Sequence, residues 1–217
     1  MIITGGKNMS KITEVKELVE AGKSKKVGAA VQEALDAGSQ PGEILEAMVA
    51  SMSVVGDKFS SGEIFVPEML IAAKAMSKGV DVLRPLMAGD SSASLGTCVI
   101  GTVAGDLHDI GKNLVSMMIE SAGFTMVDLG VDVPAENFVK AAKEHDNVDL
   151  IACSGLLTTT MPALKEAVAT IKSSGLTGCK VIVGGAPVTP EFAAEIGADG
   201  YAPDAGSAAV KAKELVG

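Results

Sequence analysis

Apolar residues in the first third of the chain recur every three or four positions, which is the spacing of one helix face. The clearest run follows Pro41, a residue suited to the first turn of a helix because its missing N–H is not needed there. This run continues through Phe59 and ends at Gly62. Four such runs with short connections predict a small four-helix bundle. The predicted helices are residues 11–21, 24–37, 41–61 and 67–84, with Pro85 expected to stop the last one.

From Leu95 onward, short apolar runs alternate with helix-like stretches. The predicted strands are residues 97–103, 125–129, 149–153, 180–183 and 200–202. The predicted helices are residues 112–122, 135–145, 161–173, 191–196 and 207–215. This alternation favours an α/β domain with a five-stranded parallel sheet covered by helices on both faces. The small and polar residues 89–94 indicate a linker between the two patterns.

Composition narrows the class of protein. The 217 residues are 47% hydrophobic but only 3% aromatic, so the core must be aliphatic. A formal net charge of −9 argues against a nucleic-acid binder, which needs a basic face. The sequence shows no secretory signal and no run long enough to cross a membrane. Cys98, Cys153 and Cys179 all lie in apolar runs, which predicts buried thiols in a reducing cytoplasm.

The candidate chemistry lies in Gly105-Asp106-Leu107-His108-Asp109-Ile110-Gly111, which contains one of only two histidines. An imidazole is a good metal ligand, and a carboxylate two positions earlier can orient it. The segment follows the first predicted strand, and ligands of such sheets bind at the carboxyl ends of the strands. In a flavodoxin-like strand order, it would share one crevice with Ser154-Gly155-Leu156, Gly184-Gly185 and residues 203–205.

Asp106-x-His108-x-x-Gly111, followed by Ser154-x-Leu156 and Gly184-Gly185, resembles the signature of domains that bind cobalamin base-off and His-on. Residues 55–68 resemble the helical cap that precedes this domain in cobalamin-dependent methionine synthase. They resemble more closely the small corrinoid proteins of methanol, methylamine, betaine and methoxy-arene methyltransferase systems. The resemblance implies a helical cobalamin-binding cap over residues 10–90. It also implies a Rossmann-like cobalamin-binding domain over residues 95–217.

The same resemblance implies a role for individual residues. His108 would be the lower axial ligand of cobalt, and Asp106 would fix its tautomer. Phe59 and Val66 of the cap would shield the upper face of the corrin. The residues implied to bind the cofactor are Gly105, Asp106, Leu107, His108, Asp109, Ile110, Gly111, Ser154, Leu156, Thr158, Gly184, Gly185, Ala205, Phe59 and Val66. None of them is expected to be catalytic.

One position of the cap departs from methionine synthase. Leu45 stands where that enzyme has a glutamate near the upper face of the corrin, and the nearest acid is Glu46. The sequence therefore does not assign a polar residue of the cap that would contact the upper face of the corrin.

In function, the resemblance implies a methyl carrier that is not catalytic alone. A substrate-specific corrinoid methyltransferase would load the cobalamin, giving methylcobalamin. A methylcorrinoid:acceptor methyltransferase would pass the methyl group to tetrahydrofolate or a thiol, and a reductive activase would be a third partner. No nucleic-acid or membrane partner is expected. The methyl donor stays open, because the partner selects it.

Three other functions fit parts of the sequence. A cobalamin-binding subunit of a radical mutase would share the His108 loop, but the four-helix cap argues against it. A cobalamin-based sensor would need a DNA-binding domain, and the first 90 residues hold no basic recognition helix. A response-regulator-like domain would need an acidic cluster after the first strand and a lysine after the fifth, where Pro203-Asp204 stands instead.

Overall fold

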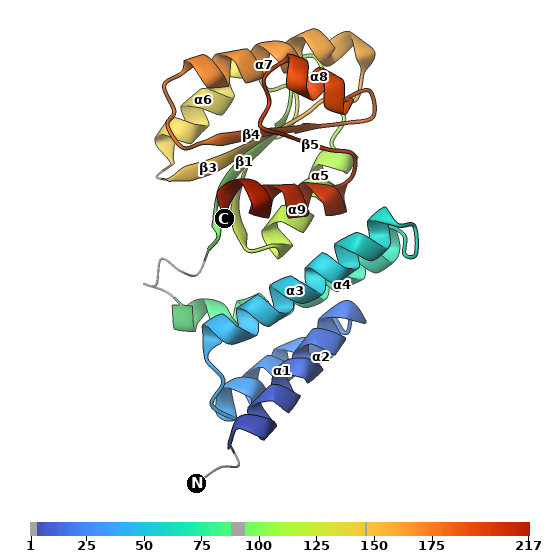
Figure 1. The fold of residues 1–217 in the computed structure, drawn as a ribbon, viewed down its shortest axis with the longest axis vertical. Helices are drawn as coiled ribbons and strands as arrows, with labels where there is room; N and C mark the ends of the chain where they lie inside the picture. Colours follow the sequence, from blue (N-terminus) through green and yellow to red (C-terminus); the bar gives the residue numbers. More distant parts are fainter. Residues whose placement is uncertain (1–3, 88–93, 146) are drawn as a thin grey trace. The chain divides into compact units, whose positions relative to one another are not determined.

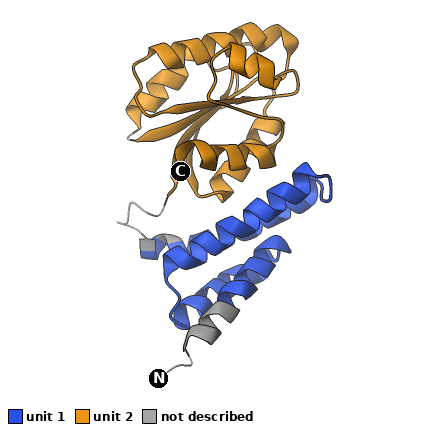
Figure 2. Ribbon diagram, viewed as in Figure 1, with its two compact units in different colours: residues 1–93 blue, residues 94–217 orange. Residues whose placement is uncertain are grey.

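The computed structural model describes residues 4–87, 94–145 and 147–217. The chain divides into two compact units, residues 1–93 and residues 94–217 (Figure 2). Within the described residues, every helix is too short or too polar to span a bilayer.

The first unit is helical, as its periodicity predicts. Its helices are α1 (Thr4–Glu20), α2 (Ser24–Asp36), α3 (Pro41–Ser60) and α4 (Val66–Met87). Helix α3 begins at Pro41, and the Glu43 side chain accepts a hydrogen bond from the Gln40 backbone N–H (3.3 Å). The core of the unit is aliphatic and rich in methionine: Met48 and Met69 are fully buried.

Two boundaries in this unit differ from the predicted ones. Helix α1 begins at Thr4, before the predicted start at Lys11. Helix α4 continues through Pro85 to Met87. Pro85 lies in the last turn, where the missing N–H removes one hydrogen bond from a helix that is already ending. Of the predicted linker 89–94, residues 89–93 lie outside the described residues.

The second unit is an α/β domain whose five strands are all parallel, in the order β2-β1-β3-β4-β5 (Figure 1). This is the predicted flavodoxin-like order. The strands are β1 (Gly96–Thr102), β2 (Phe124–Asp128), β3 (Val148–Ser154), β4 (Lys180–Gly184) and β5 (Gly200–Ala202). The helices are α5 (Ile110–Ser121), α6 (Ala135–Glu144), α7 (Met161–Ser173), α8 (Pro190–Glu195) and α9 (Ala205–Val216). A short 3₁₀ helix, η2 (Thr158–Thr160), was not predicted.

Helices cover both faces of the sheet. Helices α5 and α9 pack together on one face, and α6 and α7 pack together on the other (Figure 1). Phe138 of α6 is fully buried in a cluster of apolar side chains from β1, β3, β4 and α7. The central strands β1 and β3 are buried along most of their length, which explains their continuous apolar sequences.

One row of residues marks the carboxyl edge of the sheet. Thr102 of β1 is the register partner of Ser154 of β3, Ser154 that of Gly184 of β4, and Gly184 that of Ala202 of β5. The chain's single tyrosine, Tyr201, immediately precedes Ala202 in β5 and is half-buried. The loops that leave this row carry the candidate site.

All three cysteines are free thiols. Cys98 and Cys153 are buried in β1 and β3, as predicted. Cys179 is only half-buried and lies one residue before β4 begins, at Lys180. Burial raises the pKa of the Cys179 thiol to about 11 and raises the pKa of the other two thiols further.

Candidate cofactor-binding site

The His108 loop connects β1 to α5 and is held at both ends by hydrogen bonds. Gly105 has φ +78°, a left-handed conformation that glycine adopts without strain. Its N–H donates to Oδ1 of Asp132 (2.7 Å), which lies beyond β2. The Thr102 hydroxyl donates to the His108 carbonyl oxygen (2.8 Å). The loop is therefore a fixed turn on the edge of the sheet.

Asp106 is the center of this loop's hydrogen bonding, although its side chain is fully buried. Oδ1 accepts from the His108 N–H (3.1 Å) and lies 2.7 Å from His108 Nδ1. Oδ2 accepts from the Leu156 N–H (2.7 Å), the Thr160 hydroxyl (3.0 Å) and the Leu157 N–H (3.3 Å). A single carboxylate therefore joins the loop after β1 to the loop after β3.

These donors determine the charge of Asp106. Burial by itself would raise the pKa of this carboxyl, because it disfavours the ionised form. The hydrogen bonds from Leu156, His108 and Thr160 outweigh burial and hold the pKa well below its usual range. Asp106 is therefore a carboxylate at neutral pH, and it can accept a hydrogen bond from the imidazole.

The imidazole of His108 faces out of this network. Its side chain is 50% exposed, whereas that of Asp106 is 0% exposed. A carboxylate acceptor at Nδ1 favours the tautomer that carries its proton there. This leaves the lone pair on Nε2, the ring nitrogen that would coordinate a metal.

The loops after β3 and β4 meet through their backbones. The Gly155 N–H donates to the Gly184 carbonyl oxygen (3.1 Å). Gly185 has φ +133°, and a Cβ built on it would lie 1.8 Å from the Gly155 carbonyl oxygen. A Cβ on Gly184 would lie 2.8 Å from the Ala202 carbonyl oxygen. The fold itself therefore requires these two glycines.

Gly111 is a different kind of glycine. It lies in the first turn of α5, its φ is not positive, and a Cβ built on it meets nothing within 4 Å. Neither packing nor backbone conformation explains the missing side chain. The open space beside this residue leaves room for a ligand to approach the backbone.

Three large apolar residues of this edge are exposed: two lie near His108 in sequence, and the third follows β3. Leu107 and Ile110 are 72% and 78% exposed, and Leu156, whose N–H binds Asp106, is 40% exposed. A single nitrogen ligand among apolar side chains suits a metal whose other ligands come from a large macrocycle. The residues present at this edge therefore fit a corrinoid.

Not every residue of the predicted set belongs to this network. Thr158 is exposed, and it is Thr160, 6% exposed, that donates to Asp106. Ala205 is buried at the start of α9, after Asp204, whose side chain accepts from the Ser207 N–H (2.8 Å). Phe59 and Val66 belong to the helical unit, at the end of α3 and the start of α4.

The structure adds two residues to the network that sequence reasoning missed. Thr160 stands in a run of three threonines, and no spacing rule separates it from Thr158. Asp132 has φ +54°, uncommon for a residue other than glycine, and binds Gly105 from 27 positions away. Nothing local in the sequence indicates that contact.

Comparison with known proteins gives a consistent result. Residues 96–210 match a family model described as "B12 binding domain", and residues 12–84 match a second model with the same description. Dimethylamine corrinoid protein 1 of Methanosarcina acetivorans is 48% identical over 179 residues, which span 81% of this chain and 84% of the relative.

Two solved structures are similar over nearly the whole chain. A cobalamin-binding protein from Desulfitobacterium hafniense superposes with a TM-score of 0.81 at 30% identity, covering 95% of this chain and 98% of that one. The methanol:cobalamin methyltransferase complex MtaBC from Methanosarcina barkeri has a chain with a TM-score of 0.79, also at 30% identity. That match covers 95% of this chain and 80% of the other.

Proposed function

The chain belongs to the family of corrinoid proteins built from B12 binding domains, and from this premise we propose that it is a methyl carrier that binds cobalamin through His108. When bound, the corrinoid supplies a cobalt center that accepts a methyl group from one partner enzyme and delivers it to another. The Asp106–His108 pair is the observation that carries the proposal, because a buried carboxylate orients a half-exposed imidazole at the predicted ligand position.

In this proposal, each part of the α/β unit has a task. His108 would hold the cobalt through Nε2, and Asp106 would accept a hydrogen bond from its Nδ1–H, which increases the basicity of the ligand. The open space beside Gly111 would let the cofactor tail approach the start of α5. Leu107 and Ile110 are largely exposed and would offer apolar surface to the bound cofactor beside the imidazole. Ser154 and Gly184, at the ends of β3 and β4, border the same edge.

The helical unit has a protective task in the proposal. Phe59 and Val66 lie at the two ends of the connection between α3 and α4, and Val66 is 37% exposed. As an apolar cover for the upper face of the corrin, they would keep water away from a reactive metal center. Loading and unloading then require this cover to move aside.

The names of two relatives support the choice of partners. One relative is a dimethylamine corrinoid protein, and a solved relative is part of a complex with a methanol methyltransferase. We therefore propose a substrate:corrinoid methyltransferase specific for dimethylamine or another methylamine as the loading partner. A methylcorrinoid:acceptor methyltransferase, transferring to a thiol or to tetrahydrofolate, and a reductive activase complete the system.

Reconstitution with hydroxocobalamin tests the cofactor assignment. The wild-type chain should retain the cofactor through gel filtration and show the visible spectrum of histidine-ligated cobalamin. His108→Ala should weaken retention or shift the spectrum toward that of the free cofactor. The matched control is His145→Ala, which removes the chain's other histidine, an exposed residue just after α6. Free-cofactor spectra from the wild type would reject the proposal.

A transfer assay tests the methyl donor. Purified dimethylamine and methanol methyltransferases are each supplied with their substrate and with the reduced, reconstituted carrier. Methylation of the carrier with dimethylamine, at a rate at least tenfold above that with methanol, supports a methylamine system. The reverse order would assign the chain to a different substrate class.

A further inference from the structure

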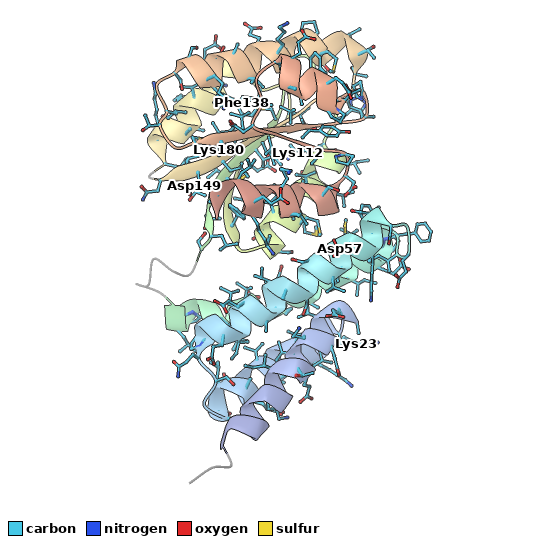
Figure 3. All side chains as sticks on the ribbon, viewed as in Figure 1. Lys23, Asp57, Lys112, Phe138, Asp149 and Lys180 are labelled. Atoms are coloured by element: carbon cyan, nitrogen blue, oxygen red, sulfur yellow. The ribbon has the colours of Figure 1, made fainter. Side chains whose placement is uncertain are left out.

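Lys112 is a buried cation that the proposed function does not use. It lies in the first turn of α5 (Figure 3), four positions after His108, and its exposed fraction is 2%. Lysine is almost never buried to this extent unless it is paired, because an unpaired charge is costly to desolvate. Here Nζ donates to Oδ2 of Asp128 (2.5 Å) and to Oδ1 of Asn113 (2.7 Å).

Asp128 is connected by hydrogen bonds of the following residues to the start of the His108 loop. Asp128 ends β2, and its Oδ1 accepts from the Gly130 N–H (2.9 Å). Two residues further, the Asp132 N–H donates to the Asp106 carbonyl oxygen (2.9 Å). The Asp132 carboxylate accepts from the Gly105 N–H. Residues 128–132 therefore bind the loop where it leaves β1.

Asn113 is connected by hydrogen bonds to the end of the same loop. The Asn113 N–H donates to the Asp109 carbonyl oxygen (2.7 Å), and its side-chain amide donates to Asp109 Oδ2 (3.3 Å). Asp109 is the residue that follows His108. Through Asn113, Lys112 is connected to Asp109, the last residue before α5. Through Asp128, it is connected to residues 128–132, which bind the first residues of the loop.

We infer that Lys112 is a positioning residue, which closes residues 105–112 into a ring of contacts with residues 128–132 and so fixes the direction of the His108 imidazole. In its cofactor aspect this inference rests on the proposed function, but the ring itself is a property of the protein alone. Without the Lys112–Asp128 pair, the loop keeps its Asp132 contacts, the Thr102 bond to β1, and the bonds that Asp106 accepts from the segment after β3. The backbone around His108 should then open more often.

Amide hydrogen exchange of the cofactor-free protein, resolved by residue with NMR, tests the ring. The variant is Lys112→Met, which keeps most of the apolar stem and removes the charge. The matched control is Lys165→Met, which removes an exposed ion pair to Glu195 (2.9 Å) on another helix. Exchange at the Gly105 and His108 amides should be at least tenfold faster in K112M than in the wild type or K165M. Exchange in the centers of β3 and β4 should not change.

Two results would overturn the inference. Unchanged exchange at Gly105 and His108 would show that the loop does not depend on Lys112. An equal acceleration at every amide would show that Lys112 stabilises the domain as a whole without positioning the loop. Should K112M fail to fold, Asp128→Asn probes the same link from its partly exposed partner, with the same two outcomes.

Spectroscopy of His108 extends the test to the imidazole. In the cofactor-free wild type, the ring ¹⁵N shifts should report one dominant tautomer, protonated at Nδ1, and K112M should shift toward a mixture. An unchanged tautomer in a folded K112M would count against the positioning role. Failure of the wild type to bind hydroxocobalamin would reject the proposed function, while the exchange data would still decide whether the ring exists.

Discussion

Asp106 shows how one side chain can determine the state of another. Its carboxylate is desolvated, yet it remains ionised because several N–H and O–H donors point at it. The same donors fix the position of the Asp106 carboxylate. The imidazole of His108, which contacts Oδ1, is therefore held in one orientation. Orientation and basicity of His108 therefore have a common origin in contacts that reach from β3.

We expect Asp106→Asn to destabilise the α/β unit by about 3 kcal/mol at pH 7, because an amide nitrogen would face donors that a carboxylate satisfies. The effect depends on pH. A carboxyl whose pKa is lowered by folding contributes its full stability above the unfolded value, about 3.9. That contribution is lost as the pH falls toward the lower folded pKa.

Urea denaturation of both proteins between pH 3 and pH 7 checks this expectation. The difference in unfolding free energy should be constant above about pH 5 and should shrink below about pH 4. A difference that stays constant to pH 3 would show that the ionised carboxylate is not what the donors stabilise.

Cys179 should react slowly with thiol reagents. With burial raising its pKa to about 11, the thiolate fraction at pH 8 is about two orders of magnitude below that of an ordinary cysteine. Mass spectrometry after iodoacetamide treatment should show slow labelling of Cys179 and none of Cys98 or Cys153 in the native protein. All three should be labelled in urea. Rapid native labelling at Cys98 would contradict the buried position in β1.

At the scale of elements, glycines with different surroundings should respond differently to the same substitution. Gly185→Ala should prevent the α/β unit from folding normally, since the new Cβ would collide with the Gly155 carbonyl oxygen. Gly111→Ala should leave stability unchanged or raise it by up to about 1 kcal/mol, because alanine favours the helix. Circular dichroism during thermal unfolding measures both effects.

The cofactor affinity of the Gly111→Ala variant tests the role of this glycine. A folded Gly111→Ala protein should bind hydroxocobalamin at least tenfold more weakly than the wild type, because the methyl group fills space that the fold leaves empty. Unchanged affinity would show that no ligand approaches the backbone there.

Much of the fold is predictable at this scale, and the reason is periodicity. Alternating apolar runs predict the strands and helices of residues 95–217 within a few positions, and the observed strand order is the flavodoxin-like one that was assumed for this pattern. The loop around His108 was identified by its residue types. Its supports were not, because Asp132 and Thr160 reach Asp106 and its neighbours through backbone geometry that only the folded chain defines. Thr158, which the resemblance implies as a cofactor contact, stays a prediction, whereas the bond from Thr160 to Asp106 is visible only in the folded chain.

At the scale of the molecule, each compact unit has its own buried core. Met48 is fully buried in the helical unit, while the cluster around Phe138 lies wholly in the α/β unit. Met48→Ala should therefore cost the helical unit about 2–5 kcal/mol. Amide exchange in β3 and β4 should stay at wild-type rates. Faster exchange in these strands would show that the two cores unfold together.

The place of Tyr201 gives the molecule a built-in optical reporter. It is the chain's one tyrosine, in a sequence without tryptophan, and it adjoins the carboxyl-edge row in β5. Ultraviolet emission of the protein therefore comes almost entirely from one position in the α/β unit. A corrin absorbs in the same spectral region, so its arrival at this edge should quench the emission by energy transfer. A simple fluorescence titration thus measures occupancy of the site without any attached label.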